Sequence, residues 1–375
     1  MIIGVPRERK TLEKRVGITP DGAAEIVKHG HKVLVETNAG AGSLFTDQDY
    51  KVSGCEIVSN LADVWTKSNL VVKVKEPHES EYQYFREDLA VFDYLHLAGM
   101  ADLTKAMVKS KITGIAFELV KSHDGRFTIL DPMSEVAGKL SILVGSYFLI
   151  SQHGGRGVLL GGTTSVPARQ VVIVGAGVAG RNACDAALGS GARVTILDKN
   201  IRQLEKVKEI FGNRAVTVYS TTAALMREIP KADLLIGAVL VPGAAAPKII
   251  TREMIKNMRK GSVFVDISID QGGCAETIRA TDLANPVYEE EGVIHYGVCN
   301  MPAQVPRTST IALAEATLPY VLKLADAGIE KALRGHPELA NALSTYHGSL
   351  TNKAVSDSVG VPYITVEEAL EKSHR

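Results

Sequence analysis

Short runs of β-branched and other apolar residues alternate with helical patterns over about the first 120 residues. This alternation is typical of a parallel sheet covered by helices, so we predict an α/β unit. Polar residues that suit a helix start, Asp21, Asn60 and Asp102, stand near the beginnings of the three helical segments. The predicted strands are Ile2–Val5, Lys32–Glu36, Leu70–Lys75, Leu89–Leu95 and Ile112–Glu118, and the predicted helices are Pro20–His29, Leu61–Ser68 and Leu103–Ser110.

A long, mostly apolar helix pattern, Ser134–His153, leads into the glycine-rich segment 154–167. Because glycine interrupts regular structure, we expect this region to join two domains. Beyond it, a second series of strands separated by helical stretches gives a complete doubly wound pattern. The predicted strands of this series are Gln170–Gly175, Arg193–Leu197, Ala215–Tyr219, Leu234–Ala238, Ser262–Ile269 and Val293–Tyr296.

The last part of the chain has a different pattern. From Thr308 onward no strand is predicted, and a long amphipathic helix to about Leu333 is followed by shorter helical pieces. A tail without a sheet of its own is expected to fold back onto the first domain. We therefore predict an α/β fold of two doubly wound parallel-sheet domains, both Rossmann-like, with a cleft between them.

The composition limits the classes of partner. The chain has 375 residues, 45% of them hydrophobic, which is enough apolar material for two cores. Lysine plus arginine equals aspartate plus glutamate at 42 each, so there is no excess of positive charge for a nucleic acid or an anionic membrane. The N-terminal region lacks the pattern of a secretory signal, and the apolar runs are too short to cross a bilayer. We expect a cytoplasmic protein that binds a small molecule, with neither a nucleic-acid nor a membrane partner.

The four cysteines are scattered, with no CxxC pair and no histidine cluster at metal-ligand spacing, so no metal site is predicted. They are interpreted as thiols in a reducing compartment. A thiolate role for Cys274, in the segment QGGCAE, is the alternative to a buried thiol that packs as a small apolar side chain. The four residues are Cys55, Cys184, Cys274 and Cys299.

A glycine-rich turn, GAGVAG, lies between a predicted strand and a helical segment. Gly175 permits the tight turn, Gly177 lets the backbone approach a pyrophosphate, and Gly180 allows close helix–strand packing. Asp198 ends the following strand, about 20 positions further on, where a carboxylate would bind the adenosine ribose hydroxyls. That carboxylate would repel the ribose phosphate of NADP, so NAD is predicted, although Arg202 keeps NADP as an alternative. The other interpretation is a purely structural turn with a solvated Asp198.

Four charged or titratable residues follow predicted strands, where ligands of open α/β sheets bind. Arg15 lies in the polar loop 6–19, Lys75 closes one strand, His96 follows another, and Asp270 ends the strand that contains Val263 to Ile269. An arginine fork with a lysine suits the carboxylate of an α-amino or α-keto acid.

Reversible oxidative deamination would give the other two residues a role. It moves protons at the amine, the carbinolamine hydroxyl and water, and therefore needs groups such as His96 and Asp270. Each of the four residues also has a simpler interpretation: Arg15 and Lys75 as surface charges, His96 as a core histidine, and Asp270 as a helix cap.

Seven segments together resemble the alanine dehydrogenase family, which is related to the NAD-binding subunit of proton-translocating transhydrogenase. The resemblance covers nearly the whole chain, and its motifs are long and specific. The segments are GVPRERKTLEKRVGITP, VVKVKEP, DYLHLAG, DPMSEVAGKLS, VVIVGAGVAG, VDISIDQGGC and CNMPAQVPRTST.

The resemblance implies NAD-dependent, reversible oxidative deamination of L-alanine to pyruvate and ammonia. It implies that Arg15 and Lys75 bind the substrate carboxylate, with Lys75 also near the carbonyl oxygen, and that His96 and Asp270 are the acid–base pair. The residues that it places at the NAD site, beside the glycine loop, are Ser134, Asp198, Ser220, Asn300 and Met301.

The resemblance also implies an architecture and an assembly. Residues 1–128 and 308–375 would form a discontinuous substrate domain, residues 129–307 an NAD-binding Rossmann domain, and six copies a homohexamer. This agrees with the tail folding back onto the first domain. Gln203 departs from the pattern, because relatives often carry a lysine near the adenosine, and this puts in doubt any contribution of that position to cofactor affinity.

Three alternatives remain at this point. The chain could be an NAD(H)-binding module of a proton-translocating transhydrogenase, which need not bind an amino acid. It could be a saccharopine-type dehydrogenase that acts on a larger amino acid in a longer pocket. It could also be a non-catalytic NAD-binding regulator. The set of Lys75, His96 and Asp270 favours a free-standing dehydrogenase over the transhydrogenase module.

Overall fold

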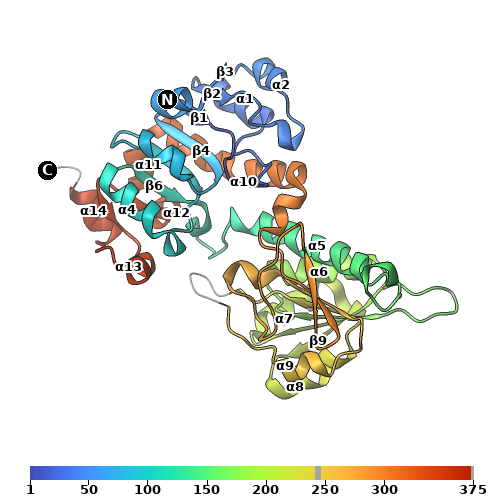
Figure 1. The fold of residues 1–375 in the computed structure, drawn as a ribbon. Coiled ribbons are helices and arrows are strands. Elements are labelled where there is room, and N and C mark those ends of the chain that lie inside the picture. Colours follow the sequence, from blue (N-terminus) through green and yellow to red (C-terminus); the bar gives the residue numbers. More distant parts are fainter. Residues whose placement is uncertain (241–245, 373–375) are drawn as a thin grey trace. The chain divides into compact units, whose positions relative to one another are not determined.

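The chain folds into two compact units in the computed structural model, which describes residues 1–240 and 246–372. Unit 1 comprises Met1–Met133 and Val305–Arg375, and unit 2 comprises Ser134–Gln304. Each unit contains a mostly parallel β-sheet with helices, which confirms the predicted fold class (Figure 1). Unit 1 is thus built from both ends of the chain, and helix α5 (Leu130–Phe148) continues from unit 1 into unit 2.

Over the part of unit 1 that the structure describes, eight strands form the sheet: β1 Ile2–Val5, β2 Lys32–Glu36, β3 Glu56–Val58, β4 Leu70–Lys75, β5 Ala90–Tyr94, β6 Thr113–Ala116, β14 Leu343–Tyr346 and β15 Ser349–Leu350. Their order across the sheet is β15-β14-β6-β5-β4-β1-β2-β3. Strands β1 to β6 pair in parallel, whereas β14 and β15 are antiparallel to their neighbours. The carboxyl ends of β1, β4 and β5 therefore lie at one edge of the sheet.

The helices of unit 1 begin close to where the sequence predicts them. Thr19 caps α1 by accepting a hydrogen bond from the amide of Gly22, with Asp21 in the first turn. Asn60 caps α3, and Asp102 lies in the first turn of α4. The helices of this unit are α1 Pro20–Lys28, α2 Asp47–Val52, α3 Leu61–Lys67, α4 Ala101–Ser110, α10 Pro306–Ala327, α11 Ile329–Gly335, α12 Pro337–Ala342, α13 Lys353–Val359 and α14 Val366–Lys372.

The C-terminal tail corrects one prediction. It does fold onto the first unit, as expected, but it contains the strands β14 and β15, where we predicted none. Ser344 and Thr345 are buried in β14, and the Thr345 hydroxyl donates a hydrogen bond to the carbonyl of Ile112. Because these polar side chains bond to the backbone, the strand lacks the apolar run that identifies other buried strands. The predicted long helix is also divided, at Gly328, whose φ of 84° ends α10.

Among the described residues of unit 2, seven strands form the sheet: β7 Gln170–Val174, β8 Arg193–Asp198, β9 Ala215–Tyr219, β10 Leu234–Gly237, β11 Val263–Asp266, β12 Val287–Glu290 and β13 Val293–Tyr296. The order is β12-β13-β11-β10-β7-β8-β9; the edge strand β12 is antiparallel to β13, and the other neighbouring strands pair in parallel. This is the doubly wound arrangement predicted. Helices α6 Val178–Gly189, α7 Ile201–Phe211, α8 Thr222–Glu228 and α9 Arg252–Lys256 belong to the same unit.

Two predicted elements that bear on the site have different bounds in the structure. The predicted strand Ser262–Ile269 ends earlier, because β11 stops at Asp266 and the 3₁₀ helix η8 (Ile267–Gln271) follows. Asp270 is therefore in η8 and not at the end of a strand. The predicted helix Ser134–His153 instead begins within unit 1 as α5 and ends at Phe148.

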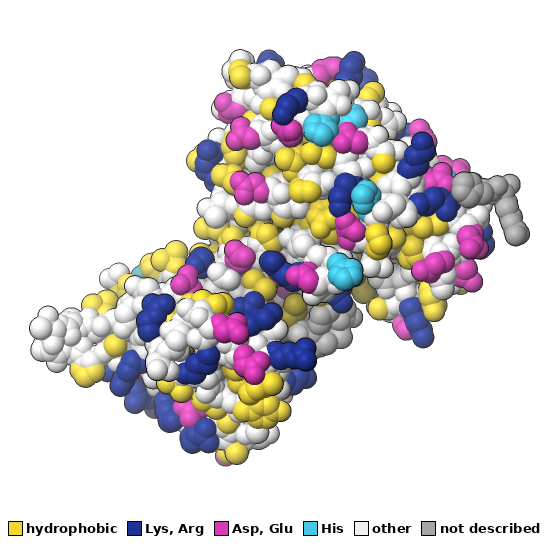
Figure 2. Space-filling view, turned by 180° about the vertical axis from the view of Figure 1, so that it is seen from behind, with side chains coloured by type: hydrophobic (Ala, Val, Ile, Leu, Met, Phe, Trp, Pro, Cys, Tyr) yellow, Lys and Arg dark blue, Asp and Glu magenta, His cyan; other side chains and the backbone are white. Residues whose placement is uncertain are grey.

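The surface carries charges of both signs. Figure 2 shows acidic and basic side chains interspersed over one face, which fits the equal numbers of the two kinds in the sequence. Within residues 1–240 and 246–372, no helix combines the length and the hydropathy that a membrane span requires.

Candidate active site

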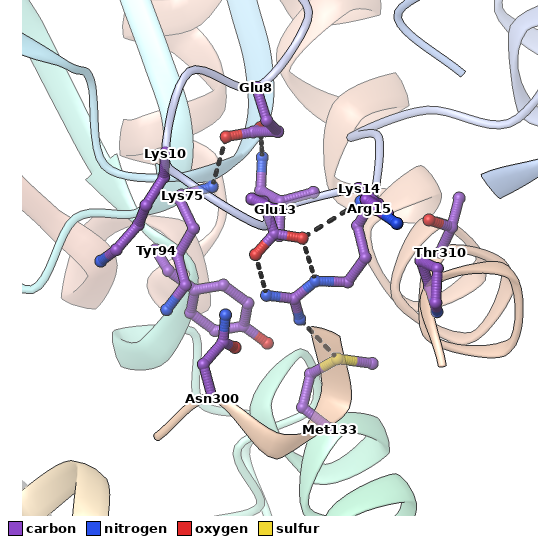
Figure 3. Close-up of polar contacts among 12 residues, drawn as sticks. Glu8, Lys10, Glu13, Lys14, Arg15, Lys75, Tyr94, Met133, Asn300 and Thr310 are labelled. Atoms are coloured by element: carbon purple, nitrogen blue, oxygen red, sulfur yellow. Dashed lines mark hydrogen bonds and ion pairs between the residues drawn. The ribbon is translucent and has the colours of Figure 1, made fainter. Parts of the chain in front are cut away.

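Arg15 is buried in unit 1, which rules out an ordinary surface charge. Only 2% of its surface is exposed, although it lies in a loop. Its Nε and Nη2 groups donate to the two carboxylate oxygens of Glu13 at 2.7 and 2.6 Å, and Nη1 lies 3.3 Å from the sulfur of Met133 (Figure 3). Burial lowers the pKa of Arg15, but the hydrogen bonds and charge of Glu13 outweigh burial and raise it. The guanidinium is thus a fixed, oriented cation.

Lys75 is the last residue of β4 and pairs across the sheet with Tyr94 of β5. Its backbone amide points to Glu8, at 3.4 Å from Oε2. Tyr94 is buried, and its hydroxyl donates to the carbonyl of Ile129 at 2.9 Å. Because burial raises the pKa of Tyr94, the phenol stays neutral. Figure 3 shows the side chain of Lys75 beside the Tyr94 ring.

His96 follows β5 and is half exposed, with 48% of its side chain accessible, so it is not a core histidine. Its backbone is left-handed (φ 48°), and its amide donates to Oε1 of Glu118 at 2.8 Å. A left-handed conformation is costly for a residue other than glycine, so the Glu118 contact helps to hold it. The ring stacks on Tyr94, with 5.8 Å between centroids.

A carboxylate accompanies the imidazole of His96. Glu76 Oε2 lies 3.7 Å from His96 Nδ1, and Glu76 Oε1 accepts a hydrogen bond from Lys10 Nζ at 2.6 Å. Burial raises the pKa of Glu76, but the interactions with His96 and Lys10 outweigh it and hold that pKa far below its ordinary value. Glu76 is therefore an anion at working pH, and its charge lies beside the imidazole of His96.

Unit 1 thus brings Arg15, Lys75 and His96 together around one side chain. Tyr94 pairs with Lys75 in the sheet, stacks on His96, and has the positive charge of Arg15 in its surroundings. Two cations and an imidazole at the carboxyl edge of a parallel sheet can bind a small carboxylic acid and exchange a proton with it. The partners Glu8, Glu13 and Glu76 were missed by the sequence analysis, because loop carboxylates look solvated until a fold buries them.

The glycine-rich turn of unit 2 fits a dinucleotide. Gly175 has a φ of 109°, and a Cβ there would lie 2.2 Å from the carbonyl oxygen of Ala238. A Cβ at Gly180 would lie 1.8 Å from the carbonyl oxygen of Gly175, so the turn packs tightly against α6. Gly177 has open space where a Cβ would stand, and no side chain caps the start of α6. The first amides of α6 can therefore bind a phosphate.

Asp198 ends β8 beside this turn. Its Oδ2 accepts a hydrogen bond from the amide of Ala176 at 2.7 Å, and its Oδ1 accepts one from the amide of Asn200 at the same distance. The backbone amide of Ser220 donates to the carbonyl of Asp198 at 3.0 Å, which puts Ser220 next to it. Arg181, which we did not single out, donates to Gln203 Oε1 at 2.5 Å. Gln203 is thus hydrogen-bonded to a residue in the first turns of α6. A lysine at position 203 would instead place a positive charge there.

The remaining sequence-based candidates of unit 2 fall into two places. Asp270 is exposed, and its Oδ1 accepts a hydrogen bond from the amide of Asn300 at 2.8 Å, with buried Met301 next in the chain. Asp266, not Asp270, caps η8, so Asp270 is not a helix cap.

Ser134 lies on α5, one turn before Gly138. A Cβ at Gly138 would lie 2.2 Å from the carbonyl oxygen of Ala179, so α5 packs closely on α6 at this point. Ser134 is therefore on the helix that packs on α6.

Cys274 does not have the features of a reactive thiol. It is fully buried, and its amide donates to Oδ2 of Asp266 at 2.7 Å. Burial and the nearby carboxylate raise the pKa of Cys274 well above its usual value, so it packs as a neutral group.

Comparisons with known proteins place these features in context. The models of the alanine dehydrogenase/PNT N-terminal and C-terminal domains match residues 4–137 and 141–353. Alanine dehydrogenase 2 of Staphylococcus aureus (strain USA300) is 50% identical over 372 residues, covering 99% of this chain and 100% of the relative. A solved L-alanine dehydrogenase is similar with a TM-score of 0.93 and 45% identity, covering 96% of this chain and 99% of that one. A transhydrogenase from Sinorhizobium meliloti gives a TM-score of 0.81 and 25% identity, covering 94% and 100%.

Proposed function

The chain belongs to the alanine dehydrogenase/PNT family, and on that premise we propose that it catalyses the reversible, NAD-dependent oxidative deamination of L-alanine to pyruvate and ammonia. One observation carries the proposal: Arg15, Lys75 and His96 gather around Tyr94 in a chain that matches an alanine dehydrogenase over its full length. The weaker likeness to a transhydrogenase, at 25% identity, makes a nucleotide-binding module the second candidate.

Each unit has its own task in this proposal. Unit 1 binds the amino or keto acid, because it contains the two cations and the imidazole. Unit 2 binds NAD, because it contains the glycine-rich turn and Asp198. The unit boundaries, near residues 133 and 305, are close to our expected domain limits at 128 and 308.

The substrate carboxylate is bound by Arg15 and Lys75. Glu13 occupies two donors of the Arg15 guanidinium and so fixes the plane in which the other N–H groups point. Lys75 adds a second positive charge, also within reach of the carbonyl oxygen of pyruvate. Such an arrangement favours a small acid whose carboxylate and carbonyl lie on adjacent carbons.

Proton transfer is assigned to His96 and Asp270. His96 takes up and returns the protons that the amine and the carbinolamine hydroxyl exchange, with the Glu76 carboxylate beside its ring. Asp270 is the second acid–base group, and its hydrogen bond from Asn300 orients it. NAD, when bound, accepts the hydride released from the substrate carbon.

The cofactor is bound by the glycine-rich turn of unit 2, by the start of α6 and by Asp198 at the end of β8. The amides at the start of α6 bind the pyrophosphate, and Asp198 binds the adenosine ribose. Further contacts are assigned to Ser134, Gly175, Gly177, Gly180, Ser220, Asn300 and Met301.

A substrate panel tests the proposed activity. The purified protein is expected to reduce NAD with L-alanine at alkaline pH and to oxidise NADH with pyruvate and ammonium at lower pH. Serine, glycine, 2-aminobutyrate and saccharopine serve as comparison substrates, with saccharopine diagnosing a larger pocket. Tight NAD binding without turnover of any amino acid would favour the transhydrogenase-type module or a regulator.

Replacement of Asp198 by asparagine is expected to weaken the preference for NAD over NADP by about tenfold or more, because the negative charge that repels a ribose phosphate is removed. Asparagine keeps one acceptor oxygen for the backbone of the turn. The measurement is the ratio of kcat/KM for the two cofactors, and the control is Asp185→Asn, an exposed position on α6. An unchanged ratio in Asp198→Asn would remove this residue from cofactor selection.

We further propose a homohexamer in the cytoplasm. The resemblance to the family supports the assembly, and the four cysteines, all free thiols in the structure, support a reducing compartment. Light scattering on the purified protein tests the assembly, since a hexamer of 40.2 kDa chains is readily distinguished from a dimer.

A further inference from the structure

The carboxylate of Glu8 lies beside the end of β4, at the position that β1 would occupy if it continued beyond Val5. Strand β1 ends at Val5, and its pairing with β4 covers Leu70 and Val71. Further along β4, the amide of Val74 donates to Glu8 Oε1 at 2.6 Å, and the amide of Lys75 lies 3.4 Å from Glu8 Oε2 (Figure 3). The carboxylate thus accepts hydrogen bonds from β4 where β1 no longer can.

The pairing of β4 with β5 is also irregular at this point, with a register shift between Val72 and Lys75. The end of β4 therefore lies beyond its pairing with β1, and its pairing with β5 is regular only up to Val72 and resumes at Lys75. A carboxylate that binds successive amides is a strong substitute, because hydrogen bonds to a charged acceptor are shorter and stronger than those to a carbonyl.

We propose that Glu8 is a positioning residue: it fixes the backbone at the end of β4 and thereby aims Lys75 at the substrate carboxylate. This inference rests on the proposed role of Lys75. Glu8 itself touches neither substrate nor cofactor in this scheme.

The surroundings of Glu8 make its charge sensitive to pH. Its side chain is 2% exposed, and burial is the main reason that the pKa of Glu8 rises to about 7. Lys73 Nζ, at 3.9 Å, opposes this rise, but it also forms an ion pair with Glu81 at 2.7 Å. The charged or titratable groups around Glu8 are Lys73 of β4, Glu13 and Arg15 of its own loop, Glu81 of the 3₁₀ helix η2 (Glu79–Tyr84) and Asp93 of β5.

A protonated Glu8 is a weaker acceptor for the amides of Val74 and Lys75. The end of β4 is then held less firmly at acid pH and most firmly once Glu8 is ionised. Substrate affinity should follow this titration, while the cofactor affinity, which depends on unit 2, should not.

Glu8→Gln tests the proposal with Glu81→Gln as the matched control. Both carboxylates are buried partners of Lys73, but only Glu8 contacts the end of β4. Glu8→Gln is expected to raise KM for pyruvate and L-alanine on the order of tenfold, with NADH affinity unchanged. Glu81→Gln should lower the melting temperature with little change in KM. An equal rise of KM in both variants would reduce Glu8 to a general structural role and overturn the proposal.

A double-mutant cycle with Lys75→Gln separates the inference from the function on which it rests. If Glu8 acts through Lys75, Glu8→Gln should have almost no further effect on KM in the Lys75→Gln background. Fully additive effects would overturn the role of Glu8 while leaving that of Lys75 intact. An unchanged KM in Lys75→Gln alone would instead overturn the proposed substrate contact.

The pH dependence of KM gives a second test, because a purely structural role of Glu8 would not make the effect of Glu8→Gln depend on pH. The ratio of KM in Glu8→Gln to KM in the wild type should be near one a unit below the Glu8 pKa of about 7 and should reach its maximum a unit above it. A ratio that is constant across this range would contradict the proposal. Glu8→Asp, which keeps the charge but shortens the reach, runs through the same cycle if Glu8→Gln does not fold.

Discussion

Replacing His96 by alanine is expected to lower kcat for L-alanine by about 10²–10⁴-fold while leaving NADH affinity unchanged, because the proton-transfer group is lost and the cofactor unit is untouched. Steady-state kinetics in both directions, with NADH binding followed by fluorescence, provide the measurement. His123, an exposed histidine of the same unit, gives the control variant His123→Ala, which should have wild-type rates.

Asp270→Asn is the companion variant. Asparagine retains an acceptor oxygen for the Asn300 amide, so the local structure is kept while the titratable group is removed. We expect a loss of kcat here as well. Wild-type rates in both His96→Ala and Asp270→Asn would show that the acid–base assignment is wrong, even if the enzyme turns over alanine.

Arg15→Ala should damage both catalysis and stability. The loss of the substrate contact is expected to lower kcat/KM for pyruvate on the order of 10²-fold. In addition, Glu13, whose side chain is 1% exposed, would lose its ion pair with Arg15, and breaking a buried ion pair costs about 3–5 kcal/mol of unfolding free energy. Kinetics together with thermal unfolding measure the two effects.

Two further variants separate these effects. Arg15→Met combined with Glu13→Gln removes both charges, so it should regain stability without regaining substrate affinity. Arg9 lies in the same loop and forms an ion pair with Glu36 of β2, so Arg9→Ala should lower stability with little effect on KM. If the double variant regained substrate affinity together with stability, the proposed contact between Arg15 and the carboxylate would be wrong.

The sequence predicted the fold well where burial is apolar. The bounds of β1, β2, β4, β9 and β13 agree with the predictions, because each is a compact run rich in β-branched residues. Predictions failed where strands are short or polar. Strand β3 has three residues, and the edge strand β12 ends in two glutamates, so neither has a recognisable period.

The residues of the site were harder to predict from the sequence than the fold. Lys75 and His96 could be singled out because Lys75 ends an apolar strand and His96 follows another. Glu8 and Glu13 could not be interpreted, because the sequence of the loop 6–19 is that of a solvated segment and only the fold buries its carboxylates. For the same reason Arg15 could be taken for a surface charge. Burial of a polar side chain depends on contacts with distant segments, which no local pattern records.

Unit 2 is inserted between the two segments of unit 1, and this order has a consequence during synthesis of the chain. Unit 2 is one continuous stretch, so it can fold while the ribosome is still adding the tail. The sheet of unit 1 is complete only after β14 has been synthesised, because β14 pairs with β6 across more than 200 residues of intervening chain. Until then the edge of β6 that faces away from β5 is unpaired, and an unpaired strand edge can associate with other chains.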